Sequence, residues 1–268
     1  MVDVYFIYKM KLMLRNKTSG SKLGGSKKNG TPDAYSDDIA ISIRLNELAA
    51  KLIRKRIPDI PFSSRKRVLD VGCGISPLGK TFSDQVYGFD LNPKSVGICR
   101  KQGMIVRVGN AEKKWKYPDK YFDIVILSHI IEHVVNTDHL IQEAKRVLKK
   151  DGIIIVNTPN LAAWFNRLLL LVGFQPFFTE VSTIDKTLGL KFSRKINPMY
   201  SPPLGHLRVF TTRALRDLLE FHGIRVTKVS GLEFYILPKF LLFFDILFSY
   251  IPGLSSSVIM LGKKDESF

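Results

Sequence analysis

Short apolar runs alternate with amphipathic stretches through the middle of the chain. These runs are rich in Val and Ile, which is the pattern of buried strands. The expected strands cover residues 67–71, 85–90, 105–108, 122–128 and 152–158, and helices are expected near 77–83, 93–102 and 137–149. Strands that alternate with helices in this way are typical of a parallel sheet with helices on both faces.

A helix and a basic segment precede this alternating region. From about Asp37 to Arg56 the apolar positions recur with helical spacing on one face: Ile41, Leu45, Leu48, Ala49 and Leu52. Much of the stretch before it is rich in Gly, Ser, Lys and Asn and lacks apolar periodicity. We therefore expect a disordered basic tail and linker over residues 1–36 and one domain over residues 37–268.

The pattern changes after Asn160. Residues 161–205 are mixed, apolar and punctuated by prolines, and we expect a lid there, inserted between the fifth and sixth strands. A helix is expected over residues 211–221, closed by Gly223, and strands near 224–230 and 257–262. Between those strands, residues 234–251 are very apolar, although Asp245 argues against a membrane-spanning helix. An interfacial helix and simple burial both remain open for this segment.

Composition narrows the classes of partner. The chain of 268 residues can bury one full-sized core. Its two cysteines form no disulfide framework and its sequence has no zinc-type spacing, so we expect no metal site and a cytoplasmic protein. The net charge of +17 points to a polyanion, either nucleic acid or an anionic membrane that the protein touches peripherally.

The turn after the first expected strand carries the clearest chemistry. Asp70 ends an apolar run, and Gly72 and Gly74 follow it one residue apart. Glycines there let the backbone approach a ligand closely, and the carboxyl end of a parallel strand is where nucleotide-like cofactors bind. Pro77 stands where a dinucleotide site has a third glycine, which argues against a nicotinamide or flavin dinucleotide.

Several motifs in order resemble those of the class I S-adenosylmethionine-dependent methyltransferases over roughly residues 60–265. They are Asp70-Val71-Gly72-Cys73-Gly74, the acid Asp90 after the second strand, Gly109-Asn110-Ala111-Glu112 after the third, and the strand over 122–126. The resemblance implies S-adenosylmethionine as cofactor. It also implies a Rossmann-like α/β fold, a seven-stranded and mostly parallel sheet with helices on both faces.

The same resemblance assigns cofactor-binding residues. The loop after Asp70 would lie against the methionine portion, Asp90 would bind the ribose hydroxyls, and Asn110, where the family more often has Asp, would lie near the adenine. The full expected set is Asp70, Gly72, Cys73, Gly74, Asp90, Leu91, Asn110, Ala111 and Ser128. The alternatives are that the glycines only make a tight turn and that Asp90 caps the helix beginning at Pro93.

Three histidines are the candidate catalytic or acceptor-contacting residues. His129 and His133 follow the fourth strand, and His133 forms a Glu-His pair with Glu132 that resembles small-molecule members of the family. His206 lies where the lid returns to the sheet. A hydroxyl acceptor benefits from a base, which imidazole supplies. Structural roles remain the alternative for each histidine.

The acceptor is the least defined part. After the fourth strand the chain has Ser128-His129-Ile130-Ile131, not the Asp/Asn-Pro-Pro-aromatic motif of amino-methylating nucleic-acid enzymes. Methylation of a cytosine carbon needs a cysteine nucleophile at this place, and neither cysteine lies there. The segments around Thr158-Pro159-Asn160 and His206-Leu207-Arg208 resemble methyltransferases of glycan, glycolipid and quinone pathways. We therefore expect methyl transfer to an oxygen of a small-molecule, saccharide or lipid-linked acceptor. An RNA methyltransferase and a non-catalytic adenosylmethionine-binding protein are the alternatives.

Overall fold

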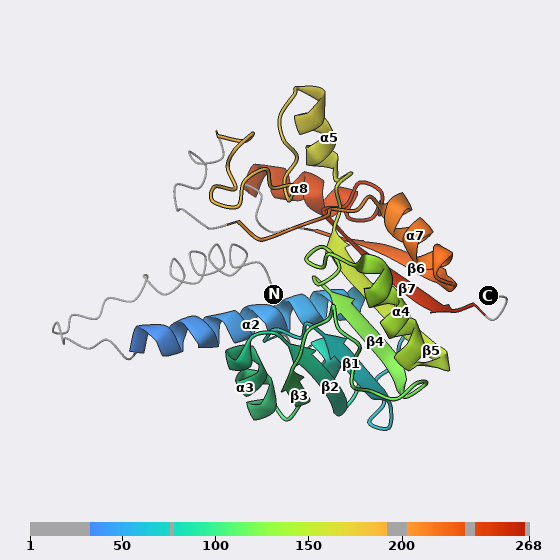
Figure 1. Ribbon diagram of the computed structural model, residues 1–268. Coiled ribbons are helices and arrows are strands. Elements are labelled where there is room, and N and C mark those ends of the chain that lie inside the picture. Colours follow the sequence, from blue (N-terminus) through green and yellow to red (C-terminus); the bar gives the residue numbers. More distant parts are fainter. Residues whose placement is uncertain (1–32, 76–77, 192–202, 234–238, 266–268) are drawn as a thin grey trace.

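The computed structural model describes residues 33–75, 78–191, 203–233 and 239–265. Seven strands form one sheet: β1 Arg67–Val71, β2 Gln85–Asp90, β3 Ile105–Val108, β4 Phe122–Ser128, β5 Leu148–Pro159, β6 Ile224–Leu232 and β7 Ser257–Lys264. Their order across the sheet is β3-β2-β1-β4-β5-β7-β6. The first five strands are parallel, whereas β7 runs antiparallel to both β5 and β6 (Figure 1). The predicted mostly parallel, seven-stranded sheet is confirmed.

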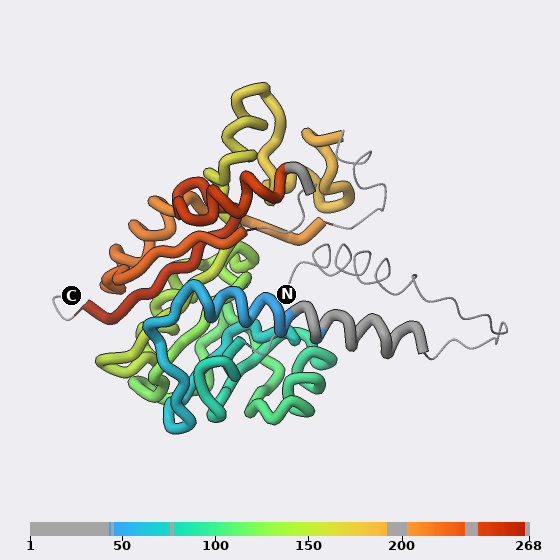
Figure 2. The backbone as a smooth tube through the Cα atoms, turned by 180° about the vertical axis from the view of Figure 1, so that it is seen from behind, coloured from blue at the N-terminus to red at the C-terminus, as the bar shows by residue number. Residues whose placement is uncertain are grey.

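Helices cover both faces of the sheet. The helices α2 Asp33–Arg56 and α3 Pro93–Lys101 and the 3-10 helix η1 Leu78–Thr81 pack on one face, and α4 Thr137–Val147 and α7 Thr212–Phe221 pack on the other (Figures 1 and 2). The largest core cluster joins Leu140 and Leu215 of the second face to strand residues such as Val125. Fully apolar strands such as β4 are possible because both of their faces are buried.

Two further helices lie beyond the carboxyl ends of the parallel strands. The helices α5 Trp164–Leu171 and α8 Lys239–Phe248 form a separate upper layer, which both views show (Figures 1 and 2). This layer comes from the two apolar segments predicted over residues 161–205 and 234–251, of which 192–202 and 234–238 lie outside the described residues. Within the described ranges, no helix combines the length and the apolar character needed to cross a membrane.

Three predicted elements differ from the structure. The fifth strand begins at Leu148 rather than at 152, so the helix expected over 137–149 ends at Val147. The first helix begins at Asp33 rather than at about Asp37, so residues 33–36 are helical, and the rest of the predicted tail lies outside the described residues. The helix expected near 77–83 is only the short η1. Residue 77 lies outside the described residues. The 3-10 helix η1 packs closely against the sheet, since a Cβ at Gly79 would lie 2.6 Å from a methyl carbon of Val86.

Candidate functional site

The glycine turn after β1 is held tightly against its neighbours. Gly72 and Gly74 have φ angles of +64° and +53°, which favour glycine. A Cβ at Gly72 would lie 2.8 Å from the Cδ1 atom of Ile130, in the loop after β4. The backbone N–H groups of Gly72 and Cys73 donate to the carbonyl oxygen of Phe89 at 2.9 and 3.2 Å. The turn therefore forms a cradle of bare backbone at the carboxyl edge of the sheet.

Asp90 is fixed by backbone donors at the end of β2. Its Oδ2 atom accepts the N–H of Gly74 at 2.9 Å, and its Oδ1 atom accepts the N–H of Asn92 at 2.8 Å. The cap of helix α3 is Asn92, whose side chain accepts the N–H of Lys94. Asp90 is therefore not the cap. Its half-buried carboxylate keeps lone pairs for a vicinal diol such as a ribose.

Asp70 is a buried carboxyl group with an unsatisfied oxygen. Burial raises its pKa to about 7, against the opposing effect of a backbone hydrogen bond from Gly79. Its Oδ2 atom has no hydrogen-bond partner among the described residues. An orphaned buried carboxyl oxygen beside the glycine cradle fits the ammonium group of the cofactor's methionine portion, which would supply the missing donor and a compensating charge.

The other predicted cofactor residues lie along the same edge in different environments. The Cys73 side chain is buried against Val86 and Cys99, so it can offer only backbone atoms to a ligand. Leu91 is 67% exposed, and Ala111 is buried. Asn110 is exposed, and its Oδ1 atom accepts the N–H of Glu112 at 2.8 Å. Ser128 ends β4, and its hydroxyl oxygen accepts a hydrogen bond from Asn157 at 3.2 Å.

His129 is committed to hydrogen bonds at both ring nitrogens. Its backbone has a φ of +52°, which turns the chain sharply after β4. The Nδ1 atom lies 3.1 Å from Oε1 of Glu132, and Nε2 lies 3.0 Å from the side-chain nitrogen of Asn157. Because the amide nitrogen donates to Nε2, the ring proton belongs on Nδ1 and faces Glu132. His129 therefore orients Glu132.

Glu132 is completely buried and remains ionised. Its Oε2 atom accepts the hydroxyl of Thr158 at 3.0 Å. Burial acts to raise the pKa of Glu132, but the hydrogen bond from His129 and the nearby imidazoles of His129 and His133 hold that pKa below its usual range. The result is a buried negative charge at the carboxyl edge of the sheet.

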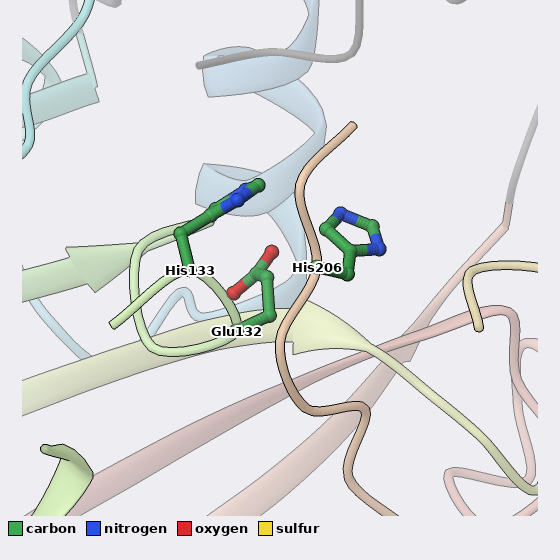
Figure 3. Close-up of side chains that lie close together, drawn as sticks. All are labelled: Glu132, His133 and His206. Atoms are coloured by element: carbon green, nitrogen blue, oxygen red, sulfur yellow. The ribbon is translucent and has the colours of Figure 1, made fainter. Parts of the chain in front are cut away.

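His133 and His206 meet over this carboxylate (Figure 3). Their ring centroids lie 4.9 Å apart, with the rings edge to face. Burial lowers the pKa of His133, and the charge of Glu132 only partly offsets that effect. The backbone N–H of Leu207 donates to the carbonyl oxygen of Glu132 at 2.8 Å, which docks the returning lid segment onto the loop after β4.

Two residues that support this arrangement were not predicted. Glu180 accepts the backbone N–H groups of Leu204 and Gly205 at 2.5 and 2.8 Å and so anchors the segment that carries His206. Asn157 joins Ser128 to His129. The sequence around Glu180 does not indicate that this acid holds a distant backbone segment. Asn157 could have been suspected because it is a polar residue near the end of a buried apolar strand.

Relatives of the chain are methyltransferases of several kinds. Residues 43–229 match the family model described as "Methyltransferase domain". The mitochondrial ubiquinone biosynthesis O-methyltransferase of Rattus norvegicus is 26% identical over 212 residues, covering 71% of this chain and 55% of the relative. The ajmaline N-methyltransferase of Rauvolfia serpentina is 33% identical over 111 residues, covering 37% and 38% respectively. The chain thus spans about half the length, or less, of these curated relatives.

Solved structures share the fold at low sequence identity. A SAM-dependent methyltransferase from Thermotoga maritima has a TM-score of 0.55 at 18% identity, covering 82% of this chain and 91% of that one. Another from Archaeoglobus fulgidus has a TM-score of 0.52 at 20% identity, covering 82% and 94%. Taken with the family match, the glycine cradle and the orphaned carboxyl oxygen of Asp70, these findings show that the chain belongs to the methyltransferase domain family, with S-adenosylmethionine as its cofactor.

Proposed function

We propose that the chain transfers the methyl group of S-adenosylmethionine to an oxygen of a lipid-linked acceptor, at the surface of an anionic membrane. The observation that carries this proposal is the orientation of α8. Its acid, Asp245, is buried and accepts the indole N–H of Trp164 at 3.1 Å. Phe243 and Leu247 of the same helix are 69% and 52% exposed. A helix on a water-facing surface would have the opposite arrangement.

The exposed apolar surface continues onto α5. Leu168, Leu171 and Val172 are exposed on and just after that helix, and Leu171 is the most exposed of them. Trp164 joins the two helices, with its ring 5.6 Å from that of Phe248. Exposed apolar surface concentrated in one layer marks an interaction site, and two such helices side by side suit the interfacial region of a bilayer.

Charge and position support a membrane that carries the acceptor. The net charge of +17 attracts the protein to anionic lipid. The layer of α5 and α8 lies beyond the carboxyl ends of the parallel strands (Figure 1), which is the edge at which we expect the cofactor to bind. An acceptor anchored in lipid would therefore reach the cofactor side of the site without leaving the membrane.

The choice of oxygen follows from the loop after β4. An alcohol is a weak nucleophile until its proton is removed or its charge is stabilised, so an oxygen acceptor needs assisting groups. His133 and His206 bring two imidazoles and Glu132 a carboxylate to the same edge. One of the relatives described above is likewise an O-methyltransferase. In-line attack on the sulfonium methyl then depends mainly on alignment of the two reactants.

Labelled cofactor tests the acceptor class. The protein is incubated with methyl-labelled S-adenosylmethionine and, separately, with a lipid extract, a polysaccharide fraction and RNA. We expect label in the lipid fraction, in a product stable to the conditions that release methyl esters. Label in RNA would overturn the proposal, as would steeply salt-dependent binding to RNA without label in lipid. No transfer to any fraction despite cofactor binding would favour a non-catalytic protein.

Vesicle binding tests the surface. We expect Phe243→Ser combined with Leu247→Ser to lower binding to phosphatidylglycerol vesicles by at least about tenfold, because burying an exposed aromatic or aliphatic side chain in the membrane contributes about 1.5–3 kcal/mol. Phe221→Ser is the matched control, since Phe221 is 77% exposed on α7, outside the layer. Equal loss in both variants, or no binding by the unaltered protein, would contradict the membrane surface. Self-association through this layer would appear as dimers without vesicles.

A further inference from the structure

Three potential metal ligands from two distant segments converge at the carboxyl edge of the sheet. Glu132 and His133 belong to the loop after β4, and His206 belongs to the segment that returns from the lid. One donor atom from each lies within 4.8 Å of the other two. Figure 3 shows the carboxylate between the two imidazoles. Bonds of about 2.0–2.2 Å to Zn²⁺ place donor atoms within about 4 Å of one another, so small side-chain movements from this spacing would let one ion contact all three side chains.

Both imidazoles are oriented by backbone carbonyl groups. The Nδ1 atom of His133 lies 3.2 Å from the carbonyl oxygen of Gly205, and Nδ1 of His206 lies 2.9 Å from that of Phe178. A carbonyl oxygen can only accept, so each Nδ1 carries a proton and each Nε2 of the neutral ring has a free lone pair. Neither Nε2 has a hydrogen-bond partner within the described ranges. Metal-binding histidines commonly have this arrangement.

The carboxylate between them is fully buried. The described partners of Glu132 are the ring of His129, the hydroxyl of Thr158 and its own backbone N–H. A carboxylate has about four lone-pair sites, so these hydrogen bonds leave a lone pair for a further ligand. Buried charges in proteins are normally paired or coordinate metals. The cluster therefore presents a buried carboxylate with a free lone pair together with two unshared imidazole lone pairs.

We propose that Glu132, His133 and His206 bind a divalent cation, and that the donor set suits Zn²⁺. Two imidazole nitrogens and one carboxylate oxygen are ligands that Zn²⁺ accepts, and three protein ligands leave a position open for water or substrate. His129 and Thr158 then orient the carboxylate from behind, as the outer partners of metal ligands do. The sequence led us to expect no metal site, because no Cys or His spacing in it resembles a zinc site. The structure brings His206 to the Glu-His pair from a distant part of the chain.

The role of this cation in the reaction rests on the proposed function. A bound cation lowers the pKa of a coordinated hydroxyl, so the acceptor would lose its proton to solvent and attack as an alkoxide. The new C–O bond forms as the C–S bond of the sulfonium breaks, and the cofactor leaves as the neutral thioether. The cation would also tie the lid segment to the loop after β4 through His206. Binding of the cation does not itself depend on the identity of the acceptor.

Metal binding can be measured without any acceptor. Tag-free full-length protein is treated with a chelator and titrated with Zn²⁺ against a chromophoric competitor. We expect one equivalent per chain, with affinity at least about tenfold weaker in His133→Gln and in His206→Gln. His222→Gln is the matched control, because His222 also lies beside a carboxylate, 2.8 Å from Asp138, but away from the cluster.

Two results would overturn the metal site: no stoichiometric binding by the unaltered protein, or unchanged affinity in the double variant His133→Gln/His206→Gln. Calorimetry with S-adenosylmethionine checks that each variant is folded, since its cofactor residues are intact. Substitution of Co²⁺ in the unaltered protein gives an independent measure, because imidazole ligands change the visible spectrum of that ion. If Zn²⁺ binds but lipid acceptors are not methylated, the metal site stands and the proposed acceptor fails.

Discussion

The two sides of the site are assembled over different distances along the chain. On the cofactor side, the hydrogen bond from Gly74 to Asp90 joins residues 16 positions apart. On the histidine side, the contact between His133 and the carbonyl of Gly205 joins residues 72 positions apart. The first side consists of strand ends and turns whose shape is set locally. The second exists only once the lid segment has docked. A substitution on the cofactor side should therefore have different consequences from a substitution on the histidine side.

The largest expected effect is on the cofactor side. Asp90→Ala removes the carboxylate that holds Gly74 and, in our assignment, two ribose hydrogen bonds. Hydrogen bonds to a charged group contribute about 1.5–3 kcal/mol each, so affinity for S-adenosylmethionine should fall by about a thousandfold in calorimetry. Asp84→Ala is the control, an exposed acid just before the same strand. Equal affinity in the two variants would remove Asp90 from the cofactor site.

A pH effect should distinguish the cofactor-free from the loaded protein. The pKa of Asp70 is raised by burial to about 7, above its unfolded value of 3.8. Its contribution to stability is therefore present at pH values below about 4 and is lost as the pH rises towards 7, a change of a few kcal/mol. In Asp70→Asn, the free energy of unfolding measured with a chemical denaturant should fall less as the pH rises. Bound cofactor should also reduce this fall, because its ammonium group would lie beside the carboxylate. A slope unchanged in Asp70→Asn would contradict this origin.

Two glycine-to-alanine substitutions should change the stability of the protein in opposite directions. Gly72→Ala forces a Cβ into a site at φ +64° with Ile130 only 2.8 Å away, which costs about 1–3 kcal/mol and closes the cradle. Gly97 lies in α3, and a Cβ added there would meet no atom of the described residues within 4 Å beyond the neighbouring backbone of its own helix. Gly97→Ala should therefore raise the free energy of unfolding by up to about 1 kcal/mol. Thermal unfolding and cofactor calorimetry measure both. A neutral Gly72→Ala variant would mean that the turn is not sterically fixed.

The smallest effect should appear on the histidine side alone. Glu180→Ala removes the acceptor of two backbone N–H groups that hold residues 204–205. We expect amide hydrogen exchange at residues 205–208 to rise by about tenfold, which corresponds to about 1.4 kcal/mol of local stability, with cofactor affinity unchanged. Asp151→Ala, an exposed acid at the far end of β5, is the control. Loss of cofactor affinity in Glu180→Ala would show that the two sides are coupled.

Local patterns were sufficient for most of the fold. The strands over 67–71, 85–90, 105–108 and 122–128 have the predicted bounds, because each apolar run is marked at both ends by polar or turn residues. The glycine pair and Asp90 were predicted to be cofactor-site residues for a similar reason. The roles predicted for them depend on backbone conformation and on strand ends, and both leave a direct trace in the residue types.

The sequence by itself thus determined the sheet and the cofactor, and it predicted the edge at which the cofactor binds. The tertiary structure decided what His129, His133 and His206 can do, because hydrogen-bond partners fix which nitrogen of an imidazole is free, and those partners come from distant segments. It also decided that α8 turns Asp245 inward and Phe243 and Phe244 outward. Periodicity records only that a helix has two faces, whereas packing against Trp164 and Ser256 selects which face is buried.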